Sequence, residues 1–144
     1  REMRNIGRSI LAVLGGGFVC GIIVFAVEAV SSRVYPLPPG IDLTDPEAIR
    51  AAVAQLPVGA YLFVLFAWFL GPLAGAWVAA RLAPGSPVVH GMILAGIVLA
   101  SAVVNMVALP HPAWMWVAAP AAILLGGWLG ARLARPASPM PAAV

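Results

Sequence analysis

The sequence predicts an all-α membrane protein that crosses the bilayer four times. Of its 144 residues, 62% are hydrophobic and only 9% are charged, and the mean hydropathy is +1.01. Water-soluble domains carry about 25% charged residues, so a chain of this composition belongs in lipid. The apolar stretches lack the period-2 alternation of a barrel strand, which favours membrane-spanning helices.

Four apolar stretches are long enough to cross the bilayer as helices. About 20 residues at 1.5 Å per residue span roughly 30 Å of hydrocarbon. The stretches cover residues 10–30, 60–80, 89–109 and 113–133. A bundle of this size leaves no room for a separate catalytic domain, so we expect a single domain over residues 1–144. Segment 136–144 is expected to form a flexible tail.

The arginine residues indicate the orientation of the chain. The side of the spans that holds both termini carries Arg1, Arg4, Arg8, Arg81, Arg132 and Arg135. The other side carries only Arg33 and Arg50. Because basic residues accumulate on the cytoplasmic side of a membrane, we expect both termini in the cytoplasm. The net charge of +3 needs no nucleic-acid partner, since positive flanks beside anionic headgroups account for it.

The outer loop, residues 31–58, is the largest segment outside the predicted spans. Thr44 followed three residues later by Glu47 has the spacing of a capping box, and Pro46 suits a first helical turn. We therefore expect a short helix over about residues 45–55. It would be amphipathic, with one apolar stripe formed by Ile49, Ala52, Val53 and Leu56. This stripe should lie on the membrane surface or cap the bundle.

Metal and cofactor chemistry find no support in the sequence. Asp42, Asp45 and Glu47 lack the repeated spacing of a calcium loop, and acids are common in a first helical turn. Neither His90 nor His111 stands four residues from another histidine or a carboxylate. The spans hold no paired carboxylates and no serine or cysteine beside a base. We expect no catalytic residue, no metal site and no cofactor.

The second and fourth spans carry an internal repeat. Residues 75–83 align without a gap on residues 126–134, which predicts that the four spans are two repeated hairpins. In each copy a tryptophan precedes an arginine by four residues, so both side chains share one helix face near the headgroups. We interpret these pairs as interfacial anchors: Trp77 with Arg81, and Trp128 with Arg132.

Small residues recur at every fourth position in three spans. Such rows let two helices approach closely, which is a main source of helix association in lipid. The glycines expected to serve helix packing are Gly17, Gly21, Gly71, Gly75, Gly126 and Gly130.

Three polar residues are expected to meet inside the membrane. Glu28 continues the helix face of Gly17 and Gly21, and Ser101 and Asn105 are four apart at a similar depth of the third span. An ionisable group within a span is a candidate functional site. Glu28 could either clamp the first span to the third as a structural polar group or form a ligand or proton site.

Several motifs resemble a group of small four-helix bacterial inner-membrane proteins of unknown function. They are the acid Glu28 late in the first span, the loop from Tyr35 to Ala48, the segment from Gly75 to Arg81, and Pro110 to Trp114. The resemblance covers most of the chain. It implies this topology and a bacterial inner membrane, and it carries no activity.

These observations leave two functional hypotheses. The first is a non-enzymatic accessory or scaffold subunit that packs against partner membrane proteins or forms a homo-oligomer within membrane lipids. The second is a small transporter or a binder of a lipophilic ligand, with a polar site at Glu28 and Asn105. An enzyme is the weakest interpretation because the reactive groups it needs are missing from the sequence.

Overall fold

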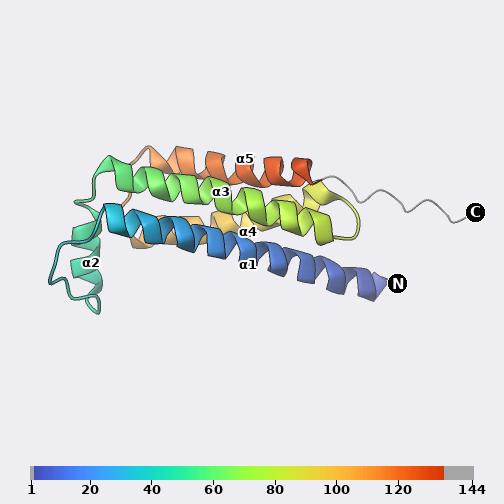
Figure 1. Ribbon diagram of the computed structural model, residues 1–144, viewed down its shortest axis with the longest axis horizontal. Coiled ribbons are helices and arrows are strands. Elements are labelled where there is room, and N and C mark those ends of the chain that lie inside the picture. Colours follow the sequence, from blue (N-terminus) through green and yellow to red (C-terminus); the bar gives the residue numbers. More distant parts are fainter. Residues whose placement is uncertain (1, 135–144) are drawn as a thin grey trace, which may run out of the picture.

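The computed structural model describes residues 2–134, and within that range it contains α-helices and no strand (Figure 1). The helices are α1 (Glu2–Val34), α2 (Pro46–Val53), α3 (Val58–Leu82), α4 (Pro87–Ala108) and α5 (Met115–Leu133). Four of them, α1, α3, α4 and α5, are long and apolar enough to cross a membrane. The predicted all-α class is confirmed. The tail expected over residues 136–144 lies outside the described residues.

Helix α1 is longer than the expected first span. Its 33 residues correspond to about 50 Å, against roughly 30 Å of hydrocarbon in a bilayer. Residues 2–9 extend it at the N-terminal end, where Met3 is 87% exposed and the helix reaches past its neighbours (Figure 1). Residues 31–34, expected in the outer loop, add one further turn at the other end. Hydropathy marks only the apolar part of a helix, whereas the backbone hydrogen bonds continue through the Arg-containing first turns.

Helix α3 is the centre of the bundle. It packs against α1, α4 and α5, whereas α1 and α4 touch each other least among the helix pairs in contact. Figure 1 shows α3 lying between α1 and α5 along most of its length. Its contact faces are built from alanines, and Ala67, Ala76 and Ala79 are fully buried. Small side chains of this kind let backbones pack closely where lipid supplies no hydrophobic driving force.

Helices α1 and α3 approach through their backbones at Gly16 and Gly75. A Cβ atom on Gly75 would lie 2.6 Å from the carbonyl oxygen of Gly16, and a Cβ atom on Gly16 would overlap the carbonyl oxygen of Gly75. The buried row of α1 consists of Ala12, Gly16 and Cys20. The contact therefore leaves no room for a side chain at either glycine.

The glycine row predicted for α1, Gly17 and Gly21, is wrong by one position, because Gly16 makes the close contact with α3. A Cβ atom on Gly21 would meet nothing within 4 Å, and one on Gly17 would meet only Leu94 Cδ1, at 3.7 Å. Three glycines follow one another at positions 15–17, so a four-residue period fits more than one helix face. The position of α3 selects the face of Gly16.

The other four glycines expected to pack helices lie at close contacts. A Cβ atom on Gly71 would lie 3.0 Å from Cys20 Sγ of α1. On α5, a Cβ atom on Gly126 would overlap the carbonyl oxygen of Phe69, and one on Gly130 would overlap that of Leu73. Together with Gly75, these glycines let α3 hold α1 on one side and α5 on another.

Helix α2 begins one residue later than the capping-box spacing predicted. Asp45 is the N-cap and accepts a hydrogen bond from the backbone N–H of Glu47. Thr44 instead donates its hydroxyl (2.6 Å) and its backbone N–H (2.8 Å) to Asp42 Oδ1, and these bonds lower the pKa of Asp42. Asp45, one residue further along the chain, caps the helix in place of Thr44, so the predicted capping role of Thr44 was wrong.

The apolar stripe of α2 packs toward the end of the bundle. Ala52 is buried, and Leu56 packs against the main apolar core. Figure 1 shows α2 lying across the end of the bundle opposite the two termini. The helix thus lies at one end of the bundle, and the two expected placements of its stripe, on the membrane surface or over the bundle, stay predictions.

Candidate functional site

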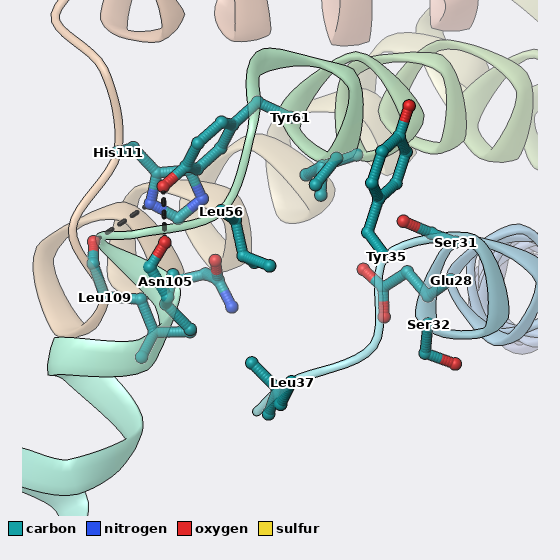
Figure 2. Close-up of a pocket in the computed structure, with 13 residues that line it drawn as sticks. Glu28, Ser31, Ser32, Tyr35, Leu37, Leu56, Tyr61, Asn105, Leu109 and His111 are labelled. Carbon is teal, nitrogen blue, oxygen red and sulfur yellow. Dashed lines mark hydrogen bonds between the residues drawn. The ribbon is translucent and has the colours of Figure 1, made fainter. Parts of the chain in front are cut away.

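A cavity of about 300 Å³ lies at the α2 end of the bundle. The last turns of α1 and α4, the first turns of α3, α2 and the loops beside them enclose it (Figure 2). Its polar lining comes from Glu28, Ser31, Ser32, Tyr35, Tyr61, Asn105 and His111. We call this cavity the head pocket. Glu28 is the only carboxylic acid among the described residues that line it, and no lysine or arginine lines it.

One wall of the head pocket is formed by the end of α1 and the loop that follows it. Figure 2 shows Glu28 and Tyr35 together on this side. Tyr35 is held by its backbone N–H, which donates to the Ser31 carbonyl at 2.8 Å, and by an edge-on contact between its ring and that of Phe63. Its hydroxyl lies over Gly59, where a Cβ atom would overlap it. This glycine is needed for Tyr35 to lie against α3.

The opposite wall contains His111, whose ring orientation is fixed on three sides. Nδ1 lies 2.9 Å from the carbonyl oxygen of Leu109, and because a carbonyl only accepts, Nδ1 carries the proton. The ring stacks on Trp68 with centroids 6.0 Å apart and meets Tyr61 edge-on at 5.7 Å. Nε2 lies on the side of the ring away from Leu109 (Figure 2). In the neutral ring, Nε2 is a hydrogen-bond acceptor.

Tyr61 connects three separate segments beneath this wall. Its hydroxyl donates to the carbonyl of Val53 at 2.8 Å and lies 3.4 Å from that of Pro110. The side chain is 6% exposed and belongs to the main core. Tyr61 of α3 thereby ties α2 and the loop between α4 and α5 to the pocket.

A second cavity, of about 370 Å³, runs between α1 and α4, the helices that touch least. We call it the groove. Apart from Glu28, Ser101 and Asn105, its lining is apolar or small, and it includes Gly17, Gly21 and Trp68. Gly17 and Glu28 are separated by about 16 Å of helix. Glu28 and Asn105 also line the head pocket, so the two cavities meet at these residues.

Glu28, Ser101 and Asn105 all line the groove, with Glu28 on the α1 side and Ser101 and Asn105 on the α4 side. No hydrogen bond joins them among the described residues, and neither the Glu28 carboxylate nor the Asn105 amide has a partner within residues 2–134. Ser101 Oγ donates to the carbonyl of Ile97, one turn earlier, at 3.1 Å. A direct clamp from Glu28 to Asn105 is therefore not formed.

The Trp–Arg pairs lie at the opposite end of the bundle from the head pocket. The guanidinium carbon of Arg81 is 5.1 Å from the Trp77 ring centroid, and Arg132 stands at the same distance from Trp128. These cation–π contacts at equivalent helix ends fit the expected role as anchors. They contribute nothing to the lining of either cavity.

His90 forms a separate polar link near the termini. Its Nδ1 lies 2.9 Å from the Ser86 carbonyl and its Nε2 lies 3.0 Å from Ser9 Oγ of α1. With Nδ1 protonated, Nε2 of the neutral ring accepts a hydrogen bond from the Ser9 hydroxyl. Only the Nε2 bond joins α4 to α1, because Ser86 is the N-cap residue of α4 itself.

Sequence reasoning missed Tyr61 and His111 as members of the site. His111 was considered only as a metal ligand, and a tyrosine at the start of a span, such as Tyr61, is ordinary at a membrane interface. The available signal was the Pro110-His111-Pro112 sequence, in which two prolines restrict the backbone on both sides of one polar ring.

The site offers hydrogen bonds and one negative charge to a ligand. Within the described part of the chain, no three His, Cys, Asp or Glu residues are grouped so as to hold a metal ion. Ser32 Oγ donates to the Ala29 carbonyl at 3.0 Å, and the imidazole of His111 lies on the wall opposite Ser31 and Ser32 (Figure 2). The arrangement suits recognition of a polar group at the mouth of an apolar groove.

Comparison with known proteins gives no relative. No protein-family model matches the chain, and neither a curated protein nor a solved structure is significantly similar to it.

Proposed function

We propose that this chain is a multi-pass protein of the bacterial inner membrane that binds an amphiphilic ligand without transforming it. The polar end of the ligand occupies the head pocket, and its apolar tail lies in the groove between α1 and α4. This proposal develops the second hypothesis drawn from the sequence, a lipophilic-ligand binder with a polar site at Glu28 and Asn105.

The observation that carries the proposal is the meeting of the two cavities. Both cavities have mostly apolar walls, but seven of the thirteen residues that line the head pocket carry polar side chains, whereas three of the twelve that line the groove do. The two cavities are of similar size and share Glu28 and Asn105 as lining residues. An amphiphile has the same division between a polar and an apolar part. A purely apolar ligand would leave the head pocket unused, and a small polar one would leave the groove unused.

The head pocket must supply most of the selectivity. Lipid tails are as apolar as the groove, so moving a tail from the bilayer into the groove gains little free energy. Hydrogen bonds to a charged group are stronger, because such bonds contribute about 1.5–3 kcal/mol each. We therefore expect Glu28 and the polar side chains opposite it to decide which amphiphile binds.

Native mass spectrometry in a neutral detergent tests the proposed function. When phospholipid is titrated into the delipidated protein, occupancy should saturate at one molecule per chain, because each chain has one head pocket and one groove that border the same residues, Glu28 and Asn105. Bulk lipid that merely surrounds the helices adds further molecules without saturating. Adducts that increase steadily with concentration and show no preferred stoichiometry would contradict the proposal.

The proposed orientation places the head pocket at the outer side of the membrane and both termini in the cytoplasm. Thr44 and Ser86 are exposed at opposite ends of the bundle and give a matched pair of labelling sites. With Cys20 replaced by alanine, an impermeant thiol reagent applied to spheroplasts should label Thr44→Cys and spare Ser86→Cys. The reverse pattern would invert the topology.

The surface of α1 favours the accessory subunit as a second candidate function. One face of this helix carries a row of large apolar side chains, 63–75% exposed: Leu11, Leu14, Phe18 and Phe25. In the membrane this row contacts either lipid or a partner helix. Co-purification of a stoichiometric partner from native membranes, lost when Phe18 and Phe25 become alanine, supports this candidate. Purification without any partner contradicts it.

A further inference from the structure

The head pocket has the chemistry of a site for one class of membrane lipid. We propose that the bound amphiphile is a phospholipid whose head ends in a primary ammonium group, and that this ammonium pairs with the Glu28 carboxylate. The inference rests on the amphiphile binding proposed above and adds the identity of the head.

The first argument is the charge of the cavities. Among the described residues that line the head pocket and the groove, Glu28 is the only carboxylic acid, and neither lining contains a lysine or an arginine. Its carboxylate has no ion pair or hydrogen bond with any described residue. A carboxylate held beside apolar helix faces interacts most favourably with a cation that the ligand brings, whereas an anionic group at this point would be repelled.

The second argument concerns the kind of cation. A quaternary ammonium has no N–H group and is recognised by a cage of aromatic faces. Here the aromatic side chains do not surround Glu28, because Tyr35 is held edge-on to Phe63 and the rings of Tyr61 and His111 lie on the opposite wall. A primary ammonium instead donates three hydrogen bonds. On the wall formed by the end of α1, the Glu28 carboxylate oxygens can accept such hydrogen bonds, and the Ser31 hydroxyl also lines the cavity.

The third argument is the distribution of donors across the pocket. Asn105 lies on the far side from Glu28 and has no hydrogen-bond partner among the described residues (Figure 2). Its amide N–H groups suit the phosphate oxygens of a head whose ammonium lies at Glu28. A zwitterionic head thus places its positive end at the carboxylate and its phosphate near a neutral donor. The acyl chain continues from there into the groove, which Asn105 also lines.

Three phospholipids with identical acyl chains and ethanolamine, choline or glycerol heads test this inference. They share the phosphate and differ only in ending with a primary ammonium, a quaternary ammonium or hydroxyls. Competition for the saturable site, read by native mass spectrometry, should favour the ethanolamine lipid by about tenfold over either other lipid, the effect of one charge-assisted hydrogen bond. Equal occupancy by the three lipids in the wild-type protein would overturn the inference while leaving the proposed function intact.

The Glu28→Gln variant assigns the preference to one side chain. Glutamine keeps the shape and removes the charge, and since Glu28 has no hydrogen-bond or ion-pair partner within residues 2–134, thermal stability should be unchanged. The preference for ethanolamine should fall below about twofold. Glu47→Gln is the matched control, because Glu47 lies on α2 outside both cavities and should keep the full preference. A folded Glu28→Gln protein that retains the tenfold preference would overturn the inference. Absence of saturable binding by every lipid would instead overturn the proposed function.

Discussion

Replacement of Gly75 by leucine is expected to lower the free energy of unfolding of the bundle by at least about 3 kcal/mol, the upper end of ordinary overpacking. The new Cβ atom would stand 2.6 Å from the Gly16 carbonyl oxygen and 2.9 Å from both Cys20 Cβ and Leu94 Cδ2. Backbone atoms cannot rotate away as a flexible side chain can. Accommodation therefore requires α1 to separate from α3, and the whole contact between them is lost. Unfolding in a mixed-micelle denaturant titration measures the effect.

Gly96→Leu is the matched control for this change. Gly96 is also a glycine inside a helix, on α4, but a Cβ atom there would meet nothing within 4 Å. Since leucine favours the helical backbone by up to about 1 kcal/mol over glycine, this variant should be as stable as the wild type or slightly more stable. Equal losses in Gly75→Leu and Gly96→Leu would show that the close α1–α3 approach is not what holds the bundle together.

Gly21→Leu is expected to abolish most ligand binding while leaving the fold intact. Gly21 lines the groove, yet a Cβ atom on it meets nothing within 4 Å. A leucine side chain can therefore be accommodated, and it extends into the volume proposed for the ligand tail. Because a tail displaced from the groove must also draw its head away from Glu28, we expect a loss of affinity of at least about tenfold, equivalent to 1.4 kcal/mol.

The sequence was sufficient to predict which segments are helices that could span a membrane. Apolar runs of 20 residues have few alternatives, because every backbone hydrogen bond must be satisfied within the segment. The short helix after the first span was also predicted from its proline and acidic residues. Its N-cap was not, because Thr44 and the adjacent Asp45 are both residue types that cap helices, and only the backbone path shows that Asp45 accepts the N–H of Glu47.

Helix faces were harder to predict than helices. Every fourth residue of α1 from either Gly16 or Gly17 forms a row that includes a small residue, and both rows satisfy the same periodicity. Only the arrangement of neighbouring helices distinguishes them. In the structure the row of Gly16 packs on α3, whereas the row of Gly17 and Gly21 borders the groove.

The candidate site was predicted in part for a similar reason. Glu28, Ser101 and Asn105 could be grouped because they lie at one depth on helices that run in the same direction. Tyr61 and His111 join them through contacts between distant segments. The Tyr61 hydroxyl lies near a carbonyl 49 positions along the chain, and the His111 ring stacks on Trp68. No local pattern specifies such contacts.

Quenching of Trp68 fluorescence by a tail-brominated ethanolamine phospholipid shows directly whether the lipid tail lies in the groove. Trp68 lines the groove and is 6% exposed, so the lipid tail reaches it efficiently only from within the groove. The difference in emission between each protein and its Trp68→Phe counterpart gives the fluorescence of Trp68 alone, without that of the other tryptophans. At low brominated-lipid fractions, quenching of this signal should saturate in the wild type and in Gly96→Leu and should be absent in Gly21→Leu. Identical quenching in all three proteins would contradict binding of the tail in the groove.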